Sequence, residues 1–70
     1  MDDERLLAEL GKRIRAEVEH KGASITVTAE LAGITREYLR KVMAGKQALT
    51  VPKLYAIAEA LGVRPVDLLP

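Results

Sequence analysis

The sequence has 70 residues, a length that supports one domain with a single core and excludes a second. It contains no cysteine and one histidine, His20, so disulfides are excluded and a zinc site would lack its usual sulfur and nitrogen ligands. The net charge is only +1 but is unevenly spread: residues 35–53 carry five basic side chains against one acidic, whereas residues 1–9 carry four acidic against one basic.

The hydrophobic composition and the N-terminus indicate the broad class of protein. Tyr38 and Tyr55 are the only aromatic residues, which favours a core of packed aliphatic helices over a sandwich of strands. The acidic N-terminus differs from the basic start of a signal peptide, and no apolar run approaches the roughly 18 residues of a membrane span. We therefore expect an all-α, cytoplasmic protein in which residues 1–5 are flexible and residues 6–70 form one domain.

An amphipathic pattern predicts a first helix from Leu6 to His20. Apolar residues recur there at three- and four-residue steps between charged ones. They are Leu6, Leu7, Leu10, Ile14 and Val18. Gly22 is expected to end the helix, because glycine tolerates the left-handed conformation found at helix C-termini. His20 is then expected to be a solvated partner of the negative helix end.

Two short helices are predicted next, with almost no connection between them. Ser24 is the N-cap candidate for a helix that ends before Gly33, and Thr35 is the N-cap candidate for a helix that ends before Gly45. The expected apolar face of the earlier helix consists of Thr28, Leu31 and Ala32. That of the later helix consists of Leu39, Val42 and Met43. So short a connection leaves no room for an antiparallel return, so the helices should cross steeply.

A fourth helix and a final turn complete the predicted elements. Thr50 is an N-cap candidate, and Pro52 lies in the first turn, where a missing N–H costs little. The expected buried face comprises Leu54, Ile57, Ala58 and Leu61. Tyr55 is expected at the boundary of the core. Pro65 can begin one further helical turn.

The arrangement resembles the Cro/C1-type (XRE-like) helix-turn-helix family from about residue 10 to residue 69. Ala29 stands where the family prefers a small residue, and Gly33 occupies the turn. The family's buried positions correspond to Thr28, Ala32, Ile34, Leu39 and Val42. The resemblance implies a lambda-repressor-like, compact bundle of four to five short helices, with the helix-turn-helix at the second and third.

Later segments strengthen the resemblance, and two residues depart from it. Residues 44–46 are similar to the family's loop after the recognition helix, and residues 58–63 and 67–69 are similar to its ending. Ile25 stands where the family often has glutamine, and Met43 where it often has glutamate. The sequence is therefore identified as a divergent member.

In this family the third helix enters the major groove, which implies DNA-binding roles for residues of this chain. The implied base contacts are Arg36, Glu37, Tyr38 and Lys41. The implied contacts with the DNA backbone are Ser24, Thr35, Arg40, Lys46, Gln47 and Thr50. Two alternatives stay open: the charged residues form an ordinary solvated helix face, and Ser24 and Thr50 serve only as N-caps.

The resemblance implies a small transcriptional regulator that binds double-stranded DNA as a homodimer at a palindromic operator, with repression favoured over activation. The expected self-association surface is Leu61, Val63, Val66, Leu68 and Leu69. Phage repressors and restriction-modification controllers fit equally well. The alternative class is a protein-interaction module such as an antitoxin-like partner. An enzyme is not expected, because no nucleophile with its base can be assembled, and neither a metal, a cofactor nor a small-molecule ligand is evident.

Overall fold

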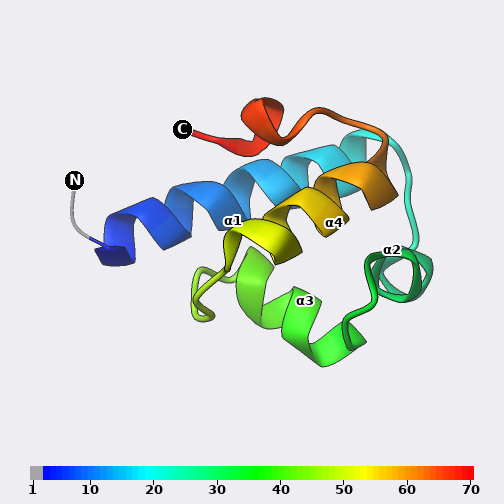
Figure 1. Ribbon diagram of the computed structural model, residues 1–70, viewed down its shortest axis with the longest axis horizontal. Helices are drawn as coiled ribbons and strands as arrows, with labels where there is room; N and C mark the ends of the chain where they lie inside the picture. The colour runs from blue at the N-terminus through cyan, green and yellow to red at the C-terminus, as the bar shows by residue number, and fades with distance from the viewer. Residues whose placement is uncertain (1–2) are drawn as a thin grey trace.

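Four α-helices and one short 3₁₀ helix make up most of residues 3–70, the part of the chain that the computed structural model describes. The elements are α1 (Asp3–His20), α2 (Ile25–Ala32), α3 (Arg36–Met43), α4 (Val51–Leu61) and η1 (Pro65–Leu68). Figure 1 shows α2 end-on while α3 runs across the picture, so these neighbouring helices cross steeply. The predicted all-α fold is confirmed. None of the helices in the described residues is long and apolar enough to cross a membrane.

The three predicted N-caps are all formed. The side-chain oxygens of Ser24, Thr35 and Thr50 accept hydrogen bonds from the backbone N–H groups of Val27, Tyr38 and Lys53, at 3.2, 3.0 and 3.4 Å respectively. Each bond satisfies one of the N–H groups that the first turn of a helix leaves without an intrahelical partner. Local side-chain chemistry therefore determines where α2, α3 and α4 begin.

The turn between α2 and α3 depends on Gly33. Its φ of 71° lies in the left-handed region, which a residue with a Cβ rarely adopts. The Gly33 N–H donates to the carbonyl of Glu30 at 3.1 Å, and the Ile34 N–H donates to the carbonyl of Ala29 at 3.0 Å. These bonds satisfy the last carbonyls of α2 and let the chain turn at once into α3.

The core is aliphatic and is assembled from several helices. Four large side chains have almost no exposed surface, and they are Ile14, Leu39, Ile57 and Leu68. α2 packs against α3 and α4, α1 packs against α3, and η1 packs against both α1 and α4. Burying one such side chain contributes roughly 1.5–3 kcal/mol. Helices too short to be stable alone are thus stabilised by their neighbours.

Two glycines let α1 approach the end of α3 closely. A Cβ added to Gly11 would lie 2.5 Å from the carbonyl oxygen of Val42 and 2.7 Å from that of Met43. A Cβ added to Gly45, whose φ is 73°, would lie 2.9 Å from the Cα of Ala8. The C-terminal end of α3 and the loop after it therefore rest directly on the backbone of α1.

The beginning of α1 differs from the prediction. The helix begins at Asp3 and not at Leu6, so residues 3–5 form its first turn, and residues 1 and 2 of the expected flexible segment lie outside the described residues. Asp3 and Glu4 favour this earlier start, because negative side chains interact well with the positive end of a helix.

Three apolar side chains expected in or beside the core are exposed, and one of them, Leu6 at the start of α1, is only just so, at 37%. The other two are further from their predicted positions. Leu31 on α2 has 68% of its surface exposed, and Tyr55 on α4 has 58%. Each lies about 100° around its helix from the sequence neighbour that packs inward, Ala32 for Leu31 and Leu54 for Tyr55. The predicted positions of these two residues were wrong, because neighbouring helices cover only one side of α2 and α4.

Candidate nucleic-acid interface

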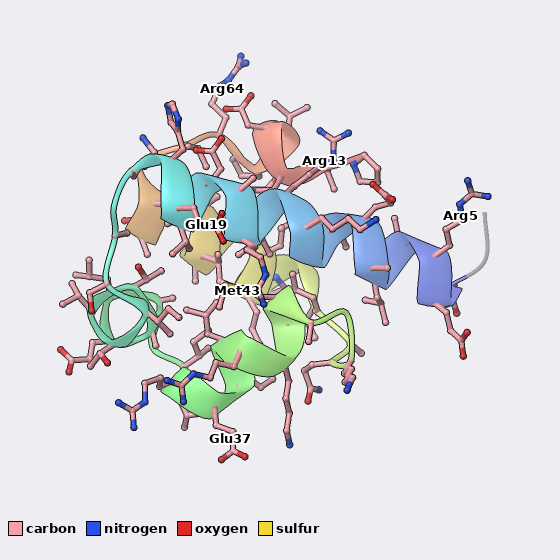
Figure 2. All side chains as sticks on the ribbon, turned by 180° about the vertical axis from the view of Figure 1, so that it is seen from behind. Arg5, Arg13, Glu19, Glu37, Met43 and Arg64 are labelled. Atoms are coloured by element: carbon pink, nitrogen blue, oxygen red, sulfur yellow. The ribbon has the colours of Figure 1, made fainter. Side chains whose placement is uncertain are left out.

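Helix α3 has one buried face and one charged face. Leu39, Val42 and Met43 are buried against the rest of the domain. The exposed residues of the helix include Arg36, Glu37, Arg40 and Lys41. Figure 2 shows Met43 toward the interior and Glu37 pointing away from the body of the molecule. The apolar positions therefore fix α3 in an orientation that presents its charges to the outside.

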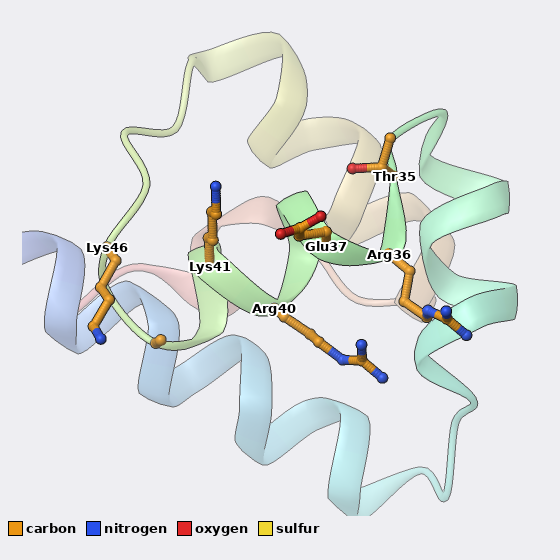
Figure 3. Close-up of a pocket in the computed structure, with 7 residues that line it drawn as sticks. Thr35, Arg36, Glu37, Arg40, Lys41 and Lys46 are labelled. Carbon is orange, nitrogen blue, oxygen red and sulfur yellow. The ribbon is translucent and has the colours of Figure 1, made fainter.

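An open hollow lies beside this charged face. It is lined by Thr35, Arg36, Glu37, Arg40, Lys41, Ala44 and Lys46. Figure 3 shows these side chains extending from the start of α3 to the loop that follows it. Four cationic groups stand against one carboxylate, so the hollow is positive although the net charge of the chain is only +1. Such a concentration of positive charge favours a polyanionic partner.

The hollow brings together six of the ten residues predicted to contact DNA. They are Thr35, Arg36, Glu37, Arg40, Lys41 and Lys46. The predicted contacts that do not line it are Ser24, Tyr38, Gln47 and Thr50. Ser24 and Thr50 are exposed at the starts of α2 and α4, where their side chains cap the helices, and Gln47 is half-buried in the loop.

Among the four predicted base contacts, Tyr38 alone does not line the hollow. Its ring packs against the hydrophobic core, and its hydroxyl donates a hydrogen bond to the carbonyl of Ala48 at 3.0 Å. The ammonium group of Lys53 lies 5.5 Å from the centre of the ring, within the range of a cation–π interaction. The side chain of Tyr38 is thus engaged with the loop after α3 and with the start of α4.

Two residues at or near the site, Lys53 and Ala44, were not among the predicted DNA contacts. Ala44 follows α3 directly and contributes to the hollow, but nothing in its side chain distinguishes it in the sequence. Lys53 did carry a signal, because a lysine in the first turn of a helix opposes the preferred charge at that end. Its partner Tyr38 is on another helix, so the interaction itself was not visible in the sequence.

The apolar surface predicted at the C-terminal end is smaller than expected. Leu68 has no exposed surface and Leu61 only 4%, so both belong to the core of this chain. Val63 is half-buried against that core. Val66 and Leu69 are 59% and 43% exposed. Leu68 was wrongly placed in the expected self-association surface, because η1 packs on α1 and α4 and Leu68 is buried there. Leu61 was expected both in that surface and in the buried face of the fourth helix, and only its buried position is confirmed.

Arg64 and Asp67 form a separate polar contact at η1. Asp67 accepts hydrogen bonds from the Arg64 backbone N–H at 3.0 Å and from its guanidinium Nη2 at 3.1 Å. The hydrogen bond from the Arg64 side chain is the largest cause that holds the pKa of Asp67 below its ordinary value, and the bond from the Arg64 backbone is the next. Figure 2 shows Arg64 on the opposite side of the molecule from Glu37, so the pair is remote from the hollow.

No three His, Cys, Asp or Glu side chains within residues 3–70 are grouped so that they could hold a metal ion.

Comparisons with known proteins point to one kind of domain. A family model described as Helix-turn-helix matches residues 14–68. The restriction-modification controller protein C.AhdI from Aeromonas hydrophila is a similar solved structure, with 30% identity and a TM-score of 0.87 over 90% of this chain and 96% of that one. The clp gene regulator ClgR from Corynebacterium glutamicum has 25% identity and a TM-score of 0.87, over 90% of this chain and 67% of that one. The DNA-binding domain of BldD has 26% identity and a TM-score of 0.84, over 100% of both chains. No match was found among curated protein sequences.

Proposed function

This chain belongs to the Helix-turn-helix family, and we propose that it is a transcriptional regulator that binds double-stranded DNA through α3. The observation that carries the proposal is the positive hollow around α3, which is the second helix of the helix-turn-helix unit. In such units this helix lies in the major groove and contacts base edges. The similar structures support the proposal, since they are a restriction-modification controller protein, a gene regulator and a DNA-binding domain.

The first two turns of α3 supply groups suited to reading bases. Arg36 can donate two parallel hydrogen bonds to guanine, and Lys41 can donate to guanine one turn later. Glu37 can accept a hydrogen bond from the amino group of cytosine. All three side chains are exposed and border the same hollow. We assign these residues to sequence recognition.

The residues around this helix are suited to the DNA backbone. Arg40 and Lys46 border the hollow, and cationic side chains bind phosphates without regard to sequence. Thr35, Ser24 and Thr50 stand at helix N-termini, where backbone N–H groups favour anions. Gln47 in the loop can donate through its amide. These contacts would fix the position of α3 on the duplex.

We further propose that the protein acts as a homodimeric repressor on a palindromic operator. One module of this kind touches few bases, and two modules related by a two-fold axis read two half-sites about one helical turn apart. Repression requires only that the bound protein cover its site, whereas activation also requires a contact with the transcription machinery. The proposed dimer contact comprises the exposed Val66 and Leu69 together with the half-buried Val63.

Leu69→Asp tests this dimer contact by gel filtration. The charged side chain would be buried and unpaired in the interface, so the variant should elute as a monomer at a concentration where the wild type elutes as a dimer. Leu69 is partly exposed in the monomer, so the circular dichroism spectrum should stay helical. A dimeric Leu69→Asp protein would contradict the assignment of this surface.

Arg36→Ala tests the DNA-binding face against a matched control. Loss of a bidentate base contact should cost about 1–3 kcal/mol of binding free energy and relax the preference at one base position. The control is Arg13→Ala, which removes the same charge from an exposed position on α1, on the side away from Glu37 in Figure 2. Equal binding by both variants would show that α3 does not contact the bases as proposed.

A further inference from the structure

Three interactions of Tyr38 link α3 to the segment that follows it. The ring packs against the core, the hydroxyl donates to the carbonyl of Ala48 at 3.0 Å, and the ammonium group of Lys53 lies 5.5 Å from the ring centre. Ala48 is in the middle of the loop from α3 to α4, and Lys53 is in the first turn of α4. One side chain therefore joins both the loop and α4 to α3.

These interactions hold the Tyr38 side chain against the loop after α3 and the start of α4. Turning the side chain toward the charged face of α3 would break the hydrogen bond with Ala48, remove the ring from Lys53 and expose the apolar ring. The backbone of Tyr38 is also fixed, because its N–H donates to Thr35 Oγ1 in the cap of α3. A tyrosine on a recognition helix can contact a base, but the hydroxyl and ring of Tyr38 are already engaged with Ala48 and Lys53.

The segment that Tyr38 holds carries several groups suited to the DNA backbone. Lys46 and Gln47 directly precede Ala48, and Thr50 follows it by two residues. Lys53 borders a second, smaller hollow together with Thr35 and Tyr38. Thr35 also lines the positive hollow, so the two hollows share this residue at their border. A fixed loop places all of these groups at set positions relative to α3.

We propose that Tyr38 is a positioning residue and that Lys53, held over its ring, is an additional contact to the DNA backbone. This inference rests on the proposed function, since it divides the DNA-binding surface into two parts. Arg36, Glu37 and Lys41 read bases, whereas Tyr38 fixes the loop and Lys53 so that they meet the phosphates while α3 lies in the groove. Tyr38 then affects affinity for every sequence and base preference for none.

Tyr38→Phe is the most direct test, because it removes the hydroxyl and keeps the ring beneath Lys53. The affinity for a selected site and for random duplex DNA should fall by the same factor, about 2- to 10-fold for one hydrogen bond. In the free protein, amide hydrogen exchange in residues 46–50 should become faster. Lys53→Ala should reduce the slope of log affinity against log salt by about 0.9, because one phosphate contact is lost. Tyr55→Phe removes the hydroxyl of the exposed tyrosine on α4 and is the matched control for Tyr38→Phe. It should change neither the affinity for DNA nor the hydrogen exchange of residues 46–50.

Two results would overturn the proposal. A change of preference at one base position in Tyr38→Phe would show that the hydroxyl reads a base. Unchanged exchange in residues 46–50 would show that the hydrogen bond does not hold the loop. Failure of the wild type to bind any duplex DNA would instead overturn the proposed function. The exchange experiment, made without DNA, would still show whether Tyr38 fixes the loop.

Discussion

The close approach of α1 to α3 makes Gly11→Ala a sharp test of the packing that holds α3. In an exposed helix interior this substitution stabilises a protein by about 1 kcal/mol, because alanine is the better helix former. Here the new Cβ would lie 2.5 Å and 2.7 Å from the carbonyl oxygens of Val42 and Met43, closer than real Cβ atoms come. Both atoms are backbone, so no change of rotamer relieves the clash and α3 must move.

The free energy of unfolding should therefore decrease in Gly11→Ala. Overpacking of this kind costs about 1–3 kcal/mol, and each 1 kcal/mol lowers the Tm of a domain this small by about 4–8 °C. Urea and thermal unfolding followed by circular dichroism measure the change, and Arg13→Ala on the exposed side of α1 is a control that should unfold like the wild type. A Gly11→Ala protein more stable than the wild type would refute the close approach of the two helices.

Two further predictions concern stability. Leu39→Ala should reduce the free energy of unfolding by about 2–5 kcal/mol, because Leu39 is fully buried. Leu31→Ala should change it by less than about 0.5 kcal/mol, because Leu31 is mostly exposed. Urea titrations compare the two variants directly, and equal losses would contradict the observed orientation of α2. The pKa of Asp67 is lowered in the folded state, so its contribution to stability is present above its unfolded pKa of about 3.9 and is lost as the pH falls through the lower folded value. Asp67→Asn should flatten this acid branch of the stability curve, and an unchanged pH dependence would exclude the Arg64–Asp67 interaction as its source.

The starts of α2, α3 and α4 and the end of α2 were predictable because they depend on local chemistry. Ser24, Thr35 and Thr50 cap α2, α3 and α4 through hydrogen bonds to N–H groups three residues ahead. Gly33 ends α2 because the left-handed conformation is required there. Each of these signals lies within a few residues of the structure it determines, and so it can be read from the sequence.

The orientation of residues beside the core was harder to predict. Helix α2 has apolar residues on several sides, and only its packing against α3 and α4 decides that Ala29 is buried and Leu31 exposed. Leu68 was expected at the surface, but it is buried because η1 packs against α1 and α4. That packing is a tertiary contact, which no local sequence pattern indicates.

The same distinction applies to the candidate site. The cluster of charges on α3 followed from helical periodicity, together with the resemblance that identified α3 as the recognition helix. The environment of Tyr38 did not, because its partners Ala48 and Lys53 lie 10 and 15 residues further along the chain. Contacts at that separation depend on the path of the intervening loop, which no local pattern in residues 44–50 specifies.

Selection of bound sequences from a random pool of duplex DNA, repeated at a low and a high salt concentration, tests whether α3 recognises a DNA sequence. A dimer that reads bases through α3 should enrich a palindromic site, and its affinity should fall steeply with salt because phosphate-bound counterions are released on binding. Salt-sensitive binding without enrichment would contradict sequence recognition by α3, and absence of binding at both concentrations would contradict the assignment of the positive hollow to DNA.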